Sequence, residues 1–288
     1  MLVNTIHFTS GLGNQLYQFF FGESLKIKFP EIQINYNDSI LDPYQLKITD
    51  IFHSSNKPIF KVNNNKNLTD YYKLSFFRLV IKLNINKFFN IYSDNTMAKK
   101  TFSSISVNNN KHFHGYWQNY NYFNSNFELI KKKLTFKEKV YLRDYDELKN
   151  YSEIIGVHFR GGDYKKNENI KIFHQVDEDY YTKNINKILK LFKNPIFLFF
   201  TDDYLHLKKI IKNFDYPHIF INEISPSRMR DFQLLSQCDH FLIPNSTFSL
   251  WAAIMNKQNK KIVVTPKNWF KHNKFNFKPF DQNWFLSI

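Results

Sequence analysis

The sequence predicts an α/β protein whose second half is a parallel sheet with helices on both faces. Short apolar segments alternate with helical segments throughout residues 154–265, which is the strand and helix order of a parallel sheet. The strand segments are continuously apolar, as expected for strands that are buried on both faces. The chain of 288 residues suffices for one large body or for two domains of ordinary size.

The first half begins with a predicted strand, a glycine-rich turn and a helix. An apolar segment at 2–8 is followed by TSGLG, and apolar residues then keep helical spacing through 14–28. Beyond this point the pattern is less regular. We expect a strand at 32–36, an irregular Asn-rich stretch to about residue 69, a helix at 70–90, a strand at 113–117 and a helix at 121–134.

A polar stretch at 140–153 separates the two halves. We therefore predict a first domain at 1–150, a second at 151–270 and a tail at 271–288. In the second half we expect strands at 154–159, 196–200, 218–222, 240–244 and 261–265, and helices at 179–192, 203–213, 227–237 and 246–256. Right-handed crossovers then bring the carboxyl ends of these strands to one side of the sheet.

The net charge and the cysteine content indicate which partners and which cellular compartment to expect. Lys and Arg number 40 against 25 Asp and Glu, so the formal net charge is +15. That charge favours nucleic acid, an anionic lipid surface or phosphorylated small molecules, and it does not choose among them. The lone Cys238 in an apolar stretch suits a reducing compartment. We expect a cytoplasmic protein, because no basic leader and no apolar run of about 18 residues occur.

Unusual residue types collect directly after the predicted strands of the second half. Ligands of open parallel sheets bind beyond the carboxyl ends of the strands, so these residues are the candidate site. They are Arg160, Gly161, Gly162 and Asp163 after the strand at 154–159, Asp202 and Asp203 after 196–200, Glu223 after 218–222, and Asn245, Ser246 and Thr247 after 240–244.

Two of these features together predict a diphosphate site. Arg160 precedes two glycines that let backbone amides approach a ligand, and its guanidinium can fork onto phosphate oxygens. The alternative is a structural ion pair with Asp163. Ser246 and Thr247 begin a predicted helix, whose first amides favour an anion. Ordinary capping without a ligand is the alternative there.

Two further features leave alternatives open, and a third concerns metal binding. Asp202 and Asp203 either accept hydrogen bonds from a base or ribose or start the next helix. His158 points to the same side as Arg160, and it is either a ligand contact or a satisfied core histidine. The Asp-x-Asp spacings at 144–146 and 177–179 do not follow strands, so we predict no metal and no other cofactor.

Five ordered segments resemble one known family. They are HFTSGLGNQLYQFFFG at 7–22, FHGYWQNYNYF at 113–123, IGVHFRGGDY at 155–164, FFTDD at 199–203 and QLLSQCDHFLIPNSTFSLWAAIM at 233–255. Their order and spacing are similar to those of glycosyltransferase family 11, the bacterial and animal α-1,2-fucosyltransferases. The resemblance implies a GT-B-like fold of two Rossmann-like domains with a cleft between them, GDP-L-fucose as donor, a galactoside as acceptor, inversion at the anomeric carbon and no metal requirement.

The resemblance also implies roles for residues. Arg160 matches the first arginine of the family's His-x-Arg-Arg-Gly-Asp motif, which grips the donor diphosphate, and Gly161 replaces the second. Gly11, Gly13, Asn14 and Gln15 match the family's GLGNQ segment, which is implied to face the fucose and the diphosphate. At the donor site the matching residues are Asn245, Ser246, Thr247 and Phe248.

We therefore expect an α-1,2-fucosyltransferase that acts on terminal galactose, in O-antigen or other surface polysaccharide synthesis. Arg160, Asp163 and His158 form the expected catalytic set, and Asp163, His174 and Glu178 are the candidates for the general base. Peripheral contact with an anionic membrane is expected, and nucleic acid is not. The alternatives are a fucosyltransferase of 1,3 or 1,6 linkage and a basic nucleic-acid- or membrane-binding protein without enzyme activity.

Overall fold

The chain folds as two compact units, the first built on Met1–Lys137 and the second on Glu138–Lys274. The computed structural model describes residues 2–54, 74–83, 90–93, 102, 105, 107, 111–161, 171–212, 214–225, 227–258, 260–271 and 280. The predicted α/β class with parallel sheets is confirmed. The predicted domain limits at 150 and 270 stay predictions.

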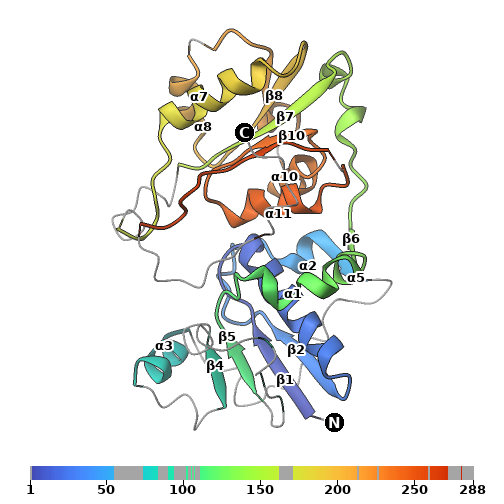
Figure 1. Cartoon of the computed structure of the whole chain (residues 1–288), viewed down its shortest axis with the longest axis vertical. Helices are drawn as coiled ribbons and strands as arrows, with labels where there is room; N and C mark the ends of the chain where they lie inside the picture. Colours follow the sequence, from blue (N-terminus) through green and yellow to red (C-terminus); the bar gives the residue numbers. More distant parts are fainter. Residues whose placement is uncertain are drawn as a thin grey trace. The chain divides into compact units, whose positions relative to one another are not determined.

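The first unit is built on a four-stranded parallel sheet of order β2-β1-β5-β4 (Figure 1). Its strands are β1 (Leu2–His7), β2 (Ile32–Asn37), β4 (Ile91–Ser93) and β5 (His112–His114). Helix α1 (Leu12–Lys28) follows β1, and α3 (Leu74–Lys82) precedes β4. The predicted strands at 2–8 and 32–36 and the first helix are confirmed, whereas β4 was not predicted.

Aromatic side chains of α1 form much of the core of the first unit. Phe19, Phe20 and Phe21 are buried on successive positions of the helix. Phe21 stacks on Trp117, with 4.1 Å between ring centroids and 5° between ring planes. Full burial of an aromatic side chain typically contributes about 1.5–3 kcal/mol, so this cluster fixes α1 on its sheet.

Two predictions in the first half are wrong. The strand expected at 113–117 ends at His114, because Gly115 and Trp117 take positive φ angles of 157° and 55° that break the strand. The helix expected at 121–134 is replaced by the short elements η3 (Tyr120–Tyr122), η4 (Asn124–Asn126), α5 (Phe127–Lys131) and β6 (Leu134–Phe136).

Local asparagine hydrogen bonds explain the lost helix. The side chain of Asn119 accepts from the amide of Asn121, and the side chain of Asn124 accepts from the amide of Ser125. Such bonds offer the backbone an alternative to the α-helix. Strand β6 instead pairs antiparallel with β3 (Phe52–Ser54), which follows α2 (Ile48–Ile51). Residues 70–73 and 84–89 of the helix expected at 70–90 lie outside the described residues.

The second unit carries a five-stranded parallel sheet of order β11-β10-β7-β8-β9. The strands are β7 (Glu153–Phe159), β8 (Pro195–Thr201), β9 (His218–Phe220), β10 (His240–Leu242) and β11 (Val263–Val264). The helices are α7 (Glu178–Leu189), α8 (Tyr204–Ile210), α9 (Ile221–Ile224), α10 (Arg228–Leu235) and α11 (Thr247–Met255). The single-turn elements η5 (Leu142–Asp144) and η6 (Asp146–Leu148) precede β7.

Helices cover both faces of this sheet, as predicted. Helices α7 and α8 lie on one side, and α10 and α11 lie on the other (Figure 1). Ile155, Val157 and Phe159 of β7 join the apolar cluster that includes residues of α7. On the opposite face a Cβ at Gly156 would lie 2.8 Å from Cys238 Sγ, so only glycine allows α10 and the turn after it to approach this closely.

The strand expected at 218–222 ends at Phe220. Residues 218–222 were expected to be a strand, but Ile221 starts α9 because the Glu223 carboxylate accepts a hydrogen bond from the amide of Phe220 at 3.3 Å. Glu223 also accepts from the hydroxyl of Tyr204. The glutamate therefore caps a helical turn at the edge of the sheet.

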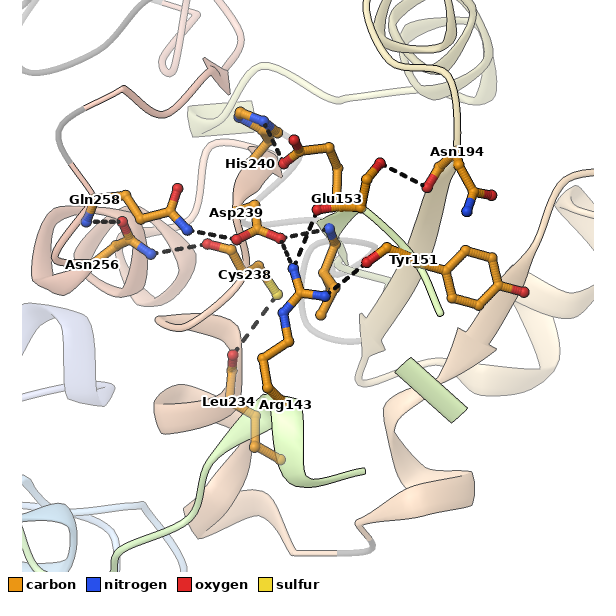
Figure 2. Close-up of polar contacts among 12 residues, drawn as sticks. Arg143, Tyr151, Glu153, Asn194, Leu234, Cys238, Asp239, His240, Asn256 and Gln258 are labelled. Carbon is orange, nitrogen blue, oxygen red and sulfur yellow. Dashed lines mark hydrogen bonds and ion pairs between the residues drawn. The ribbon is translucent and has the colours of Figure 1, made fainter. Parts of the chain in front are cut away.

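A polar network ties the start of β7 to the rest of the second unit (Figure 2). The Arg143 guanidinium lies 2.6 Å from the Asp239 carboxylate and donates to the carbonyl of Tyr151 at 2.9 Å. Asp239 also accepts from the amide of Ile154, at 2.8 Å, and from the side chain of Gln258. The single-turn helices before β7 are thereby joined to β7 and β10.

Candidate functional site

Arg160 and Ser246 meet at the carboxyl edge of the second sheet. Arg160 follows β7 and Ser246 precedes α11, which begins after the neighbouring strand β10. The guanidinium Nη1 lies 3.5 Å from Ser246 Oγ. The structure therefore brings together the two features that the sequence assigned to one diphosphate site, although they lie 86 residues apart.

The start of α11 adds to the positive character of this edge. The helix has no acidic side chain in its first turn, and its N-cap residue Ser246 makes no side-chain capping hydrogen bond. The first amides of a helix carry a partial positive charge that favours anions. Thr247 and Phe248 are half-buried here, as is Arg160. The arrangement suits an anionic group such as a phosphate.

His158 lies beneath this edge as a neutral ring. Its side chain is buried against Phe248, with 5.7 Å between ring centroids. Burial, with a smaller effect of the Arg160 charge, lowers the pKa of His158 from 6.5 to about 3. Within the described part of the chain its Nδ1 has no hydrogen-bond partner. A group with so low a pKa is a weak base near neutral pH, so His158 fits a contact better than proton transfer.

The two acids after β8 have different tasks. Asp203 is the N-cap of α8, because its side chain accepts from the amide of His206 at 3.2 Å. Asp202 Oδ1 accepts from the amide of Gly161 at 2.8 Å. The helix-start interpretation therefore applies to Asp203. A contact of either acid with a base or ribose stays a prediction.

Asn245 holds the backbone around the site. Its side-chain amide donates to the carbonyl of His174 at 2.8 Å and to that of Trp269 at 2.9 Å. It is buried, and it joins the segment before α7 to the segment after β11. Trp269 was not found by sequence reasoning, since no motif marks it. His174 in the segment before α7 and Glu178 at the start of α7 are both exposed.

The glycine-rich turn of the first unit starts α1. Gly11 is the N-cap residue, and a Cβ there would meet nothing within 4 Å. Gly13 is buried in the first turn of the helix. Asn14 donates to Ser10 Oγ at 2.9 Å and accepts from the Gln118 side chain at 2.6 Å. Gln118 belongs to the segment at 113–123 that carried the family resemblance.

The buried side chain of Gln15 hydrogen-bonds the backbone of the turn and of residues 46–48. Its amide nitrogen donates to the carbonyls of Ser10 and Leu46, both at 3.0 Å, and its oxygen accepts from the amide of Ile48 at 2.9 Å. The side chain is fully buried. Sequence reasoning missed Gln18, which similarly donates to the carbonyl of Gly115 at 2.7 Å. Contact of this turn with a donor stays a prediction.

Three further expectations concern the loop after Arg160, a metal site and a membrane span. Gly162 and the catalytic candidate Asp163 lie outside the described residues. Across the ranges that the structure describes, His, Cys, Asp and Glu side chains form no group of three or more that could hold a metal ion. No described helix has both the length and the apolar character to cross a membrane.

Comparison with known sequences identifies relatives over most of the chain. The model of the family described as glycosyl transferase family 11 matches residues 2–286. An α-1,2-colitosyltransferase of Escherichia coli is 28% identical over 183 residues, which are 62% of this chain and 63% of that protein. The O-antigen biosynthesis glycosyltransferase WbnK of Escherichia coli is 25% identical over 92% of this chain and 94% of its own length. Mouse galactoside 2-α-L-fucosyltransferase Sec1 is 32% identical over 36% of this chain and 29% of its own length.

Comparison with solved structures identifies the fold. The fucosyltransferase NodZ from Bradyrhizobium superposes with a TM-score of 0.58 at 14% identity, covering 91% of this chain and 95% of NodZ. A crystal of NodZ α-1,6-fucosyltransferase soaked with GDP-fucose gives a TM-score of 0.57 at 13% identity, covering 91% of this chain and 94% of that one. A mutant of Arabidopsis thaliana FUT1 in complex with GDP gives 0.52 at 12% identity, covering 93% and 71%. The predicted GT-B-like fold is confirmed.

Proposed function

The chain belongs to glycosyltransferase family 11, and from this premise we propose that it transfers L-fucose from GDP-L-fucose to the 2-hydroxyl of a terminal galactose on a glycan. The observation that carries the proposal is the meeting of Arg160, Ser246 and the start of α11 at one sheet edge. GDP and GDP-fucose occur in structures of its fold relatives, which supports a nucleotide-sugar donor. The relative named for O-antigen biosynthesis supports a role in surface polysaccharide synthesis.

The proposed chemistry centres on the leaving diphosphate. The bond between fucose C1 and the phosphate oxygen breaks, and GDP departs with the electron pair. Arg160 and the first amides of α11 stabilise the negative charge that develops on that oxygen. Because these groups are already in place before the bond breaks, they act preferentially on the transition state. This positive charge also supports a reaction that needs no metal.

The acceptor hydroxyl attacks C1 from the opposite face, so the anomeric configuration inverts. A new bond from its oxygen to C1 forms, and its proton passes to a general base. Asp163, His174 and Glu178 remain the candidates for this base. We assign His158 a contact with the donor instead, since its lowered pKa disfavours protonation.

A second donor is favoured by one specific observation. The α-1,2-colitosyltransferase of Escherichia coli matches 62% of this chain at 28% identity. We therefore propose nucleotide-activated colitose as a second candidate donor for the same site. Both candidates share the 1,2 linkage that the names of the sequence relatives give.

The test is incubation of the full chain with each donor and a panel of galactosides that differ in the sugar below galactose. We expect a fucosylated product whose linkage analysis gives position 2 of galactose, with equal yield in EDTA. A product linked at position 3 or 6 overturns the regiochemistry. Absence of transfer with any donor, together with a melting temperature unchanged by GDP, overturns the proposed function.

Membrane contact is a further part of this proposal. The net charge of +15 favours an anionic lipid surface, where a lipid-linked acceptor would be available. Co-sedimentation with anionic vesicles that is lost with zwitterionic vesicles supports this part. Equal sedimentation with both overturns it. Family membership favours the enzyme over a nucleic-acid-binding protein.

A further inference from the structure

The acid pair after β8 is bonded to the residue that follows Arg160. Strands β7 and β8 pair in parallel through Phe159 and Thr201, the last residues of each. Immediately beyond that pair, Asp202 Oδ1 accepts a hydrogen bond from the amide of Gly161 at 2.8 Å. The carboxylate thus continues the contact between the two strands past their last backbone pairing, at the point where Arg160 leaves the sheet.

Asp203 holds the same glycine from a second direction. A Cβ placed on Gly161 would lie 2.6 Å from Asp203 Oδ2 and 2.7 Å from Asp203 Cβ. Asp203 itself is fixed, because its amide donates to Thr201 Oγ1 at 2.9 Å and its side chain caps α8 through His206. The backbone at Gly161 therefore has a hydrogen bond on one side and a packed side chain on the other.

We propose that Asp202 is a positioning residue for Arg160. By holding the amide of Gly161 it fixes the backbone from which the guanidinium extends, and so aims the guanidinium at the donor diphosphate. A carboxylate that met the diphosphate directly would repel it, whereas one bonded to a backbone amide has its charge partly compensated. The proposal rests on the proposed function, since it takes the diphosphate as the ligand of Arg160.

A double-mutant cycle tests the proposal. The variants are Arg160→Ala, Asp202→Ala and both together, each measured for GDP affinity and for kcat and KM of transfer. Alone, Asp202→Ala is expected to weaken GDP binding about tenfold, because it removes a charge-assisted hydrogen bond and loosens the arginine. In the Arg160→Ala background the same change is expected to alter GDP binding by less than about twofold, because nothing is left to position.

The conservative variant separates position from charge. Asp202→Asn keeps an oxygen that accepts the Gly161 amide, so it is expected to retain GDP affinity within about threefold of the unaltered protein. If the effects of Arg160→Ala and Asp202→Ala simply add, Asp202 meets the nucleotide by itself, and the proposal is overturned. It is also overturned if Asp202→Ala binds GDP as the unaltered protein does.

A matched control and a folding check complete the experiment. Asp146→Ala removes a carboxylate of the same unit whose side chain is 87% exposed and paired with Lys149, and it is expected to leave GDP binding unchanged. Thermal melting shows whether each variant folds. If the unaltered protein binds no GDP, the proposed function fails and this inference with it. If it binds GDP while Asp202→Ala has no effect, the inference alone fails.

Discussion

Two arginines lie just outside the two ends of β7, and their surroundings differ. Arg143 at the amino end is paired with the Asp239 carboxylate and donates to a backbone carbonyl (Figure 2). Arg160 at the carboxyl end has the neutral hydroxyl of Ser246 among its partners, at the longer distance of 3.5 Å. The printed contacts of Arg143 thus include a carboxylate, and those of Arg160 include a hydroxyl at the start of a helix.

The difference assigns separate tasks to the two edges of one sheet. At the amino edge, the partners of the Arg143 guanidinium in Figure 2 are groups of the folded chain itself. These contacts therefore act on the free energy of unfolding. At the carboxyl edge the start of α11 has no acidic side chain in its first turn, and its first amides suit an anion. Variants of the two arginines should therefore separate stability from activity.

The largest expected effect is on catalysis by Arg160→Ala. Loss of one preorganised donor to a developing charge typically costs about 100–1,000-fold in rate, or roughly 3–4 kcal/mol. We expect a fall of that size in kcat/KM for GDP-fucose with an unchanged midpoint of urea unfolding. For Arg160→Lys we expect an intermediate kcat/KM, because lysine keeps the positive charge but cannot donate two parallel hydrogen bonds to a phosphate. Near-normal kcat/KM in Arg160→Ala would contradict the site.

The next effect is on stability, by Arg143→Ala. Asp239 is 8% exposed, and in this variant its carboxylate would lose its cationic partner. The amide of Ile154 and the side chain of Gln258 would still donate hydrogen bonds to it. A hydrogen bond to a charged group contributes about 1.5–3 kcal/mol, and the half-exposed Arg143 puts the expected loss near the lower end, about 2 kcal/mol. Urea unfolding measures it, with kcat of the folded fraction unchanged. A lowered kcat without a lowered midpoint would contradict the separation of the two edges.

Sequence reasoning finds the carboxyl edge and misses the amino edge, for a physical reason. Arg160, Asp202 and Ser246 each follow an apolar strand, and the topology of parallel sheets brings strand ends together. Arg143 lies in a polar stretch that resembles any solvated linker. Its partner Asp239 is 96 residues away, and the ion pair becomes visible only in three dimensions.

The roles of individual polar side chains were less predictable than their places. A donor contact of Gln15 stays a prediction, and the sequence did not show that its side-chain amide bonds the backbone of Ser10, Leu46 and Ile48 within the first unit. Amide side chains satisfy buried backbone groups as readily as they bind ligands, and spacing alone does not separate the two uses. The asparagines at 119 and 124 similarly replaced an expected helix with short turns.

A third effect is the pH dependence of stability at the carboxyl edge. The pKa of His158 is about 3 in the folded chain against an ordinary 6.5, so between these values the unfolded chain binds the proton and the folded chain does not. Stability is therefore lost as the pH falls through this window, by roughly 2 kcal/mol at pH 5 from this residue. His158→Gln should unfold with a smaller difference between pH 7 and pH 5. The midpoint of urea unfolding at the two pH values measures this, and an unchanged difference would contradict the buried neutral imidazole.

The smallest effect is expected for Ser246→Ala. Replacing an N-cap serine by alanine typically costs about 1 kcal/mol, but that cost arises from a side-chain hydrogen bond to the helix amides. Ser246 makes no such bond, whereas Asp177, the N-cap of α7, accepts from the amide of Tyr180 at 3.0 Å. Asp177→Ala should therefore lose about 1 kcal/mol of stability and Ser246→Ala less than about half of that.

Ser246→Ala should also have only a small effect on activity. A donor to acceptor distance of 3.5 Å marks a weak hydrogen bond, so removing the Ser246 hydroxyl is expected to raise KM for GDP-fucose by no more than about threefold. Because Arg160 keeps its place through Gly161 and Asp202, kcat should hold. If Ser246→Ala instead destabilised the chain as much as Asp177→Ala, the hydroxyl would be serving α11, and the carboxyl edge would resemble the amino edge in using its polar groups for the fold.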